Sequence, residues 1–135
     1  MKKIKVAAKA FVLKDNNILL IKRSLSQTEG KIVWDIPGGG IEEGESFEDA
    51  LHREIMEEVG LKVKICDTIR AWNFKQEDGM TYGISFLTKY LSSEIKLSDE
   101  HEDYKWVKIN LCQEMDIDDW IKDEAKVVAA RLKDV

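Results

Sequence analysis

The chain has 135 residues, of which 44% are apolar and 35% are charged, and its formal net charge is −5. This length corresponds to about one domain, and the apolar fraction suffices for a hydrophobic core, which excludes an intrinsically disordered chain. Because the net charge is negative and the basic residues are scattered, we expect no nucleic-acid partner. No apolar run approaches the roughly 18 residues of a membrane span, so no membrane partner is expected either.

The first 15 residues are basic and then apolar, as in a signal peptide. Lys9 and Lys14 bracket the apolar part, however, and no small-residue cleavage pattern follows, so we interpret the segment as a strand and expect a cytoplasmic protein. Cys66 and Cys112 lack the spacing of a disulfide framework or a zinc site, which predicts free thiols. Without a repeat or a linker-like stretch, residues 1–135 are expected to form a single domain.

The N-terminal third is predicted to consist mostly of strands. Apolar β-type runs at residues 6–13 and 18–21 flank the polar residues 14–17, which is the pattern of a β-hairpin. Residues 25–31 are polar and predict a loop. A short strand at residues 34–36 then ends before a proline and three consecutive glycines.

A helix is predicted to follow the glycines. Ser46 is a good N-cap residue, and Glu48 and Asp49 suit the positive end of the helix dipole in the first turn. The helix should extend to Val59, where Gly60 can adopt the left-handed conformation that ends a helix.

The C-terminal half predicts two long strands at residues 61–75 and 80–91, a shorter strand at residues 104–109, and a last amphipathic helix. Asp118 or Asp119 can cap this helix, which should extend to about residue 132. Because strands and helices mix without regular βαβ alternation, we expect an α/β (α+β) fold in which helices cover a mixed sheet.

The first helix carries acidic residues where folding alone would not place them. At about 100° per residue, its apolar arc consists of Phe47, Ala50, Leu51, Ile55 and Val59. Glu54 and Glu58 project into this arc, and Glu57 lies beside it. These carboxylates repel one another, oppose the helix dipole near its C-terminus and crowd an apolar face. A divalent cation would offset all three costs, and hard oxygen ligands suit Mg²⁺ or Mn²⁺.

Two observations keep other interpretations open. Glutamate-rich helix faces are usually only solvated, and Arg53 can neutralise Glu57 one helical turn away. The glycines Gly38–Gly40 are by themselves typical of a turn, although their backbone could approach a phosphate or a metal closely. Beside three carboxylates, the glycines become a candidate second wall of one site.

These residues together resemble the Nudix box of the Nudix hydrolases, in a MutT-like form. The 23-residue segment fills every fixed position of that box: Gly39-x5-Glu45-x7-Arg53-Glu54-Ile55-x-Glu57-Glu58-x-Gly60-Leu61. The flanking strands and the last helix are similar to the rest of the Nudix fold. The resemblance therefore implies an α/β/α sandwich, with a mixed sheet between helices, over nearly the whole chain.

The resemblance implies roles for the charged residues of the box. Glu54, Glu57 and Glu58 would be catalytic metal ligands for Mg²⁺, with Mn²⁺ as a substitute, and one of them would orient the attacking water. Arg53 and Glu45 would form a buried pair that braces the loop and the helix.

Outside these residues, the resemblance implies further metal ligands. The carbonyl oxygen of Gly38 would be one, and a downstream carboxylate another. Residues 100–106 resemble an E-H-x-x-Y-x-W pattern of the family, in which Glu100 is the expected ligand and Glu102 and Asp103 are substitutes. His101 is either a general base or, more commonly for a single histidine, a structural residue.

Substrate-binding candidates lie on both sides of the box: Arg23, Gly39, Gly40, Trp34 and Trp72. Adjacent strand residues point to opposite faces, so either Lys22 or Arg23 could meet phosphates, and the family pattern favours Arg23. Arg70, Trp72 and Phe74 share a strand face that could stack a base, although a role in the core or at a sheet edge fits equally well.

The implied activity is Mg²⁺-dependent hydrolysis of a phosphoanhydride bond in a nucleoside diphosphate linked to another moiety. Pro37 is the only proline, and markers of the ADP-ribose, NADH and coenzyme A subgroups are not visible. This favours a MutT-type pyrophosphohydrolase that acts on a nucleoside triphosphate or its deoxy form. A dinucleoside polyphosphate or nucleotide-sugar hydrolase and a non-catalytic nucleotide-binding module stay open as alternatives, and so does a homodimer.

Overall fold

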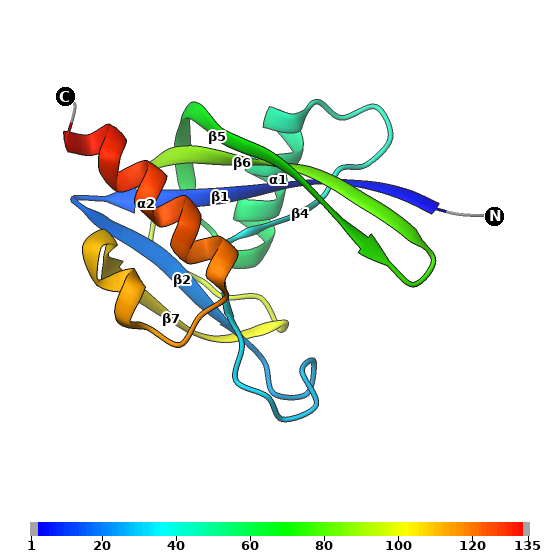
Figure 1. Ribbon diagram of the computed structural model, residues 1–135, viewed down its shortest axis with the longest axis horizontal. Coiled ribbons are helices and arrows are strands. Elements are labelled where there is room, and N and C mark those ends of the chain that lie inside the picture. The colour runs from blue at the N-terminus through cyan, green and yellow to red at the C-terminus, as the bar shows by residue number, and fades with distance from the viewer. Residues whose placement is uncertain (1–2, 134–135) are drawn as a thin grey trace.

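The computed structural model describes residues 3–133, which form one seven-stranded mixed sheet with helices (Figure 1). Its strands are β1 (Lys3–Lys14), β2 (Asn17–Arg23), β3 (Trp34–Asp35), β4 (Gly38–Gly40), β5 (Lys62–Gln76), β6 (Gly79–Ser92) and β7 (His101–Lys108). The helical elements are α1 (Phe47–Val59), the 3₁₀ helix η1 (Ile109–Glu114) and α2 (Asp119–Lys133). Within residues 3–133, no helix is long and apolar enough to cross a lipid bilayer.

The central strand β1 organises the sheet. The strand order is β3-β2-β1-β6-β5, with β4 added to β1 and β7 added to β2. Strands β1 and β6 run parallel, whereas the other described pairs are antiparallel. Because β4 pairs with the middle of β1, the three glycines lie directly beside the core of the sheet.

Each face of the sheet packs against a different helix, because alternate residues of a strand point to opposite faces. From β1, Ala8, Ala10 and Val12 face α1, whereas Phe11 and Leu13 face α2 and η1. Two separate buried clusters result, one on each face, and they form the α/β/α arrangement expected from the sequence.

Most predicted elements are confirmed, and their ends have local causes. Asp15 adopts a left-handed conformation, with a φ of 55°, in the turn between β1 and β2. Ser46 Oγ accepts a hydrogen bond from the Asp49 amide at 3.1 Å and begins α1. Gly60, with a φ of 70°, ends that helix.

Besides β1, which begins at Lys3 rather than at residue 6, and shifts of one or two residues at other strand ends, the structure differs from the sequence prediction in three places. The three glycines are not a turn but the strand β4, because glycine lets two backbones approach closely: a Cβ on Gly38 would collide with the Ala8 carbonyl oxygen. Strand β7 begins at His101 rather than at Tyr104, and the 3₁₀ helix η1 was not predicted.

Candidate active site

The glycines of β4 meet the carboxylates of α1 across a cavity. The cavity has a volume of about 570 Å³ and is lined by Gly38, Gly39, Gly40, Glu54, Glu57, Glu58, Ser98, Asp99 and Glu100. A Cβ on Gly39 would lie 2.6 Å from the Glu54 carboxyl group, so any larger residue there would displace that carboxyl group from its present position. The fold therefore joins the glycines and the three glutamates that the sequence pattern had linked.

Glu58 is the most deeply placed of these carboxylates. The residue is 9% exposed, and its Oε1 accepts a hydrogen bond from the Gly38 amide at 2.9 Å. Burial raises the pKa of Glu58 to about 7, against the lowering effects of that amide and of Lys9. A carboxyl group in this position resists ionisation unless further positive charge is supplied.

Glu54 and Glu57 are both held by the same arginine. Arg53 Nη1 lies 3.1 Å from Glu54 Oε1 and 3.3 Å from Glu57 Oε2. Burial raises the pKa of Glu54, and the arginine opposes this rise. The side chain of Glu57 is 59% exposed, so it can move without leaving a buried charge behind.

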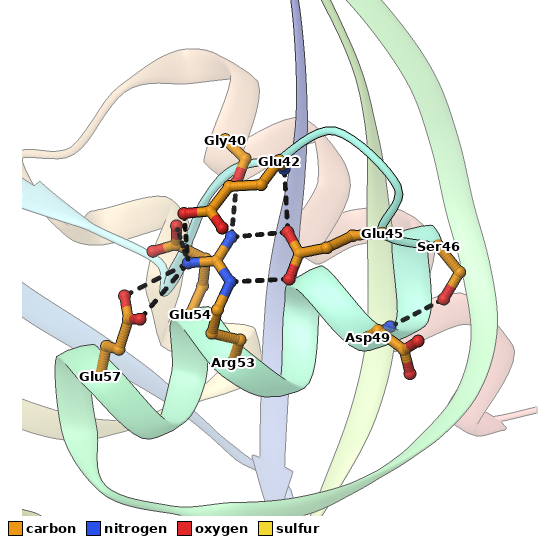
Figure 2. A network of polar contacts seen from close by, with 8 residues as sticks. All are labelled: Gly40, Glu42, Glu45, Ser46, Asp49, Arg53, Glu54 and Glu57. Atoms are coloured by element: carbon orange, nitrogen blue, oxygen red, sulfur yellow. Dashed lines mark hydrogen bonds and ion pairs between the residues drawn. The ribbon is translucent and has the colours of Figure 1, made fainter.

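Arg53 also braces the loop that precedes α1 (Figure 2). Its Nε and Nη2 donate to the two oxygens of Glu45 at 2.8 and 2.9 Å, and Nη2 donates to the Gly40 carbonyl at 3.0 Å. Glu45 in turn accepts the Glu42 amide at 2.8 Å. The hydrogen bond from Arg53 lowers the pKa of Glu45 to about 2, and Glu45 raises the pKa of Arg53. The Arg53–Glu45 pair is thus present as a two-pronged contact, although its side chains are partly exposed rather than buried as predicted.

The donors around the cavity fit a hard divalent cation. They are carboxylate oxygens, and in two of the glutamates, Glu54 and Glu58, burial opposes ionisation. The glycine backbone leaves space beside these carboxylates. Within residues 3–133, however, no three acidic, histidine or cysteine side chains already converge as a ligand cluster. Arg53 holds Glu57 and Glu54, so a cation would have to draw these carboxylates toward Glu58.

The downstream carboxylates are separated by the structure. Glu100 and Asp99 line the cavity. Glu102 instead lies 3.5 Å from Lys22 Nζ and accepts the Leu25 amide. Asp103 is exposed and caps the amide of the residue that follows it. The placement therefore favours Glu100 over its two substitutes.

His101 packs behind Glu58 rather than lining the cavity. Its side chain is 6% exposed, and Nε2 lies 3.5 Å from Glu58 Oε2. Its Nδ1 lies 3.4 Å from Ser98 Oγ. Burial lowers the pKa of His101, against the raising effect of Glu100. This position suits a structural neighbour of Glu58 better than a general base.

The two phosphate candidates before β3 have different surroundings. Lys22 pairs with Glu102. The amide of Arg23 donates to the Val33 carbonyl on the side of β2 that pairs with β3, and the charge of Arg23 lies close enough to His101 to help lower the pKa of that histidine. Neither side chain lines the carboxylate cavity. Trp34 packs against the core on the α2 side, with Lys105 Nζ 4.6 Å from its ring centroid.

A second, more apolar cavity of about 440 Å³ lies on the α2 face of the sheet. It is lined by Lys9, Asp35, Arg70, Trp72, Asn73, Phe74 and Trp120. Trp72 and Phe74 stack with their centroids 5.9 Å apart, so the predicted strand face of Arg70, Trp72 and Phe74 does form one wall.

Sequence reasoning missed the residues between the two cavities. Lys9 Nζ donates to Asp35 Oδ2 and to the Ile36 carbonyl, both at 3.1 Å, and both charged groups influence Glu58. A signal existed, because Lys9 is the single charged residue within the apolar run of residues 6–13. Trp120 carried no comparable signal, since an aromatic residue in an amphipathic helix is ordinarily part of the core.

The family model for the NUDIX domain matches residues 3–130. The chain therefore belongs to the Nudix family, and the resemblance carried by residues 39–61 is confirmed.

Two curated relatives are similar over part of their length. A Methanocaldococcus jannaschii protein named ADP-ribose pyrophosphatase is 34% identical over 107 residues, which are 78% of this chain and 62% of that protein. Nucleoside triphosphatase NudI from Escherichia coli (strain K12) is 39% identical over 88 residues, which are 56% of this chain and 61% of that protein. The matches thus span about three fifths of the length of these relatives.

A solved structure supports the fold over nearly the whole chain. The MutT protein from Methanosarcina mazei Go1 superposes with a TM-score of 0.84 at 26% identity, covering 98% of this chain and 97% of that one. The mixed sheet between helices is therefore shared with that protein.

Proposed function

We propose that this protein hydrolyses a phosphoanhydride bond of a nucleoside diphosphate linked to another moiety, with Mg²⁺ as the cofactor and Mn²⁺ as a substitute. The observation that carries the proposal is the cavity in which Glu54, Glu57 and Glu58 face the backbone of Gly38–Gly40. Three carboxylates crowded on one helix face, two of them with ionisation opposed by burial, are unfavourable for stability and suit the binding of a cation. Glu100 and the Gly38 carbonyl are the proposed additional ligands.

The glutamates of α1 and the Arg53–Glu45 pair have different proposed roles. When bound, a divalent cation supplies positive charge against the phosphates and acidifies water at the site. Glu54, Glu57 and Glu58 would hold it, and whichever carboxylate is not fully engaged would orient the attacking water. Arg53 and Glu45 would keep the loop and α1 at a fixed separation, so that the glycine backbone can approach the phosphates.

The favoured substrate is a nucleoside triphosphate or its deoxy form, cleaved to a nucleoside monophosphate and pyrophosphate, as in the MutT type. Markers of the ADP-ribose, NADH and coenzyme A subgroups are not visible in the sequence, no proline follows Pro37, and the MutT protein from M. mazei shares the fold over nearly the whole chain. The apolar cavity around Trp72 offers a place for the nucleobase, since Lys9 and Asp35 of its lining lie close enough to influence Glu58.

A second candidate is a nucleoside diphosphate sugar such as ADP-ribose. It is favoured by the name of the M. jannaschii relative, which is 34% identical over 78% of this chain. The same carboxylate cavity would cleave the diphosphate, and only the group beyond the phosphates would differ.

A substrate panel with Mg²⁺ tests the proposal. It should contain the standard and oxidised nucleoside triphosphates, ADP-ribose, other nucleotide sugars and dinucleoside polyphosphates, with separate detection of phosphate and pyrophosphate. We expect pyrophosphate from a nucleoside triphosphate and little phosphate. Turnover of no member of the panel would contradict the proposal, and cleavage of ADP-ribose alone would favour the second candidate.

A further inference from the structure

A buried carboxylate on α2 holds an arginine at the wall of the apolar cavity. Glu124 is 1% exposed, and its Oε2 accepts a hydrogen bond from Arg70 Nε at 2.6 Å. The other oxygen, Oε1, is enclosed and has no hydrogen-bond partner among the residues described. A buried carboxylate with one unpartnered oxygen is unfavourable, and an apolar side chain of similar size would often be more stable there. Packing alone therefore does not explain Glu124.

The ion pair fixes Arg70 although the arginine is partly exposed. The side chain of Arg70 is 44% exposed, and such an arginine would ordinarily sample many rotamers. Within residues 3–133, Arg70 is the only side chain that donates to Glu124, so its departure would leave a buried charge without compensation. The guanidinium group is thus held in place, and its Nη1 and Nη2 form no hydrogen bond with any described residue.

The neighbouring aromatic side chains are fixed as well. Trp72 lies two residues after Arg70 on the same face of β5 and donates from Nε1 to Ser85 Oγ at 2.9 Å. Its ring covers Gly83, where a Cβ would collide with it. Trp120, at the start of α2, lines the same cavity. A planar base among these side chains would present its edge to the unpaired nitrogens of Arg70.

We propose, on the basis of the function proposed above, that Arg70 selects a nucleobase whose edge carries two adjacent hydrogen-bond acceptors, and that Glu124 positions Arg70 for this purpose. A guanidinium group only donates hydrogen bonds. Among the purines, guanine offers two acceptors, O6 and N7, to such a fork, whereas adenine places an amino donor beside N7. The cavity is therefore specific for guanine over adenine.

Binding of nucleosides tests this specificity apart from hydrolysis, because guanosine and adenosine carry no phosphate and need no cation. Each is titrated into the full chain while the indole N–H signals of Trp72 and Trp120 are followed by NMR. We expect guanosine to bind about tenfold more tightly than adenosine. Equal binding of the two, tighter binding of adenosine, or no binding of either at millimolar concentration would overturn the proposal.

Variants of Arg70 and Glu124 test whether this ion pair causes the preference for guanosine. Arg70→Lys keeps the charge but removes the planar fork, so the guanosine preference should fall to about twofold or less. Glu124→Gln should lower the preference in the same direction, because Arg70 is then no longer held by a charge. Arg131→Lys is the matched control: Arg131 also joins α2 to β5, through the Thr68 and Ile69 carbonyls, but does not line the cavity. An unchanged preference in Arg70→Lys, or an equal loss in Arg131→Lys, would overturn the proposal.

The two proposals fail in different ways. Failure of the hydrolysis proposal would appear as a chain that discriminates between the nucleosides but releases no phosphate or pyrophosphate from any nucleotide. Failure of the specificity proposal would appear as a hydrolase whose ratio of kcat/KM for GTP and ATP is the same in the wild type and in Arg70→Lys.

Discussion

The Gly38 amide donates a hydrogen bond to Glu58 Oε1 at 2.9 Å, across 20 residues of sequence. The bond connects the glycine strand β4 to the last turn of α1, and so it sets the position of the most buried carboxylate relative to the backbone it faces. Because β4 itself pairs with the middle of β1, this part of the cavity is built on the rigid core of the sheet.

Replacing Glu58 by glutamine tests whether its charge is needed. A glutamine keeps a carbonyl oxygen that can accept the Gly38 amide, so Tm should stay within a few degrees of the wild type. The negative charge is lost, and we expect kcat in Mg²⁺ to fall at least about a hundredfold. The exposed Glu48→Gln in the first turn of the same helix is the control and should retain full activity. A near-normal rate in Glu58→Gln would contradict the assignment.

Adjacent glycines should respond differently to alanine. A Cβ at Gly39 would lie 2.6 Å from the Glu54 carboxyl group, whereas a Cβ at Gly40 would lie 3.9 Å from its nearest neighbour, the Val6 carbonyl oxygen. Gly39→Ala should therefore displace Glu54 and lower kcat/KM by about tenfold or more, because displacing a group at the site by 1 Å can cost that much. Gly40→Ala should remain close to the wild type. Steady-state kinetics on both variants makes the comparison, and equal effects would contradict this account of Gly39.

Much of the site was predictable because its residues lie in one segment with helical spacing. Glu54, Glu57 and Glu58 were identified from the conflict between their charge and the apolar arc, and the structure places all three on the cavity. The caps at Ser46 and Gly60 follow from local chemistry, and so they too could be located in advance.

What could not be predicted depends on contacts between distant segments. That the glycines form a strand depends on the partner β1, which no local pattern reveals. The family pattern favoured Arg23, and Trp34 was chosen because it precedes the glycines. Neither residue lines the carboxylate cavity, and Trp34 packs on the α2 side, which depends on how β2 pairs with β3 and β7. The ion pair of Arg70 and Glu124 joins residues 54 positions apart, and Glu124 in an amphipathic helix looks like any exposed acid.

The Arg53–Glu45 pair predicts a specific dependence of stability on pH. The pKa of Glu45 falls from an ordinary value near 4.5 to about 2 in the folded protein. A carboxyl group whose pKa is lower in the folded than in the unfolded state contributes its full stabilisation above its pKa in the unfolded state. This contribution is lost as the pH falls through its pKa in the folded state. Between pH 4.5 and 2, the wild type should therefore lose more stability than Glu45→Gln.

Chemical unfolding at several pH values measures this difference. Glu43→Gln, at an exposed position in the same loop, is the control and should follow the wild-type curve. Parallel curves for the wild type and Glu45→Gln would mean that the pair does not contribute in this way.

Removal and return of Mg²⁺ should change both activity and stability. Chelation should abolish turnover, because the carboxylates would then repel the phosphates of the substrate. Mg²⁺ that binds only the folded chain should raise the free energy of unfolding by about 2.7 kcal/mol at a hundredfold excess over its Kd.

The stabilisation by Mg²⁺ should also depend on pH. Burial raises the pKa of Glu58 to about 7 in the cation-free protein, so the stabilisation should be larger at pH 8 than at pH 6, where protons compete for the same oxygens. Thermal unfolding with Mg²⁺ and with chelator at both pH values tests this, and Glu58→Gln should show a smaller rise than Glu48→Gln. An equal rise in the two variants would exclude Glu58 as a ligand.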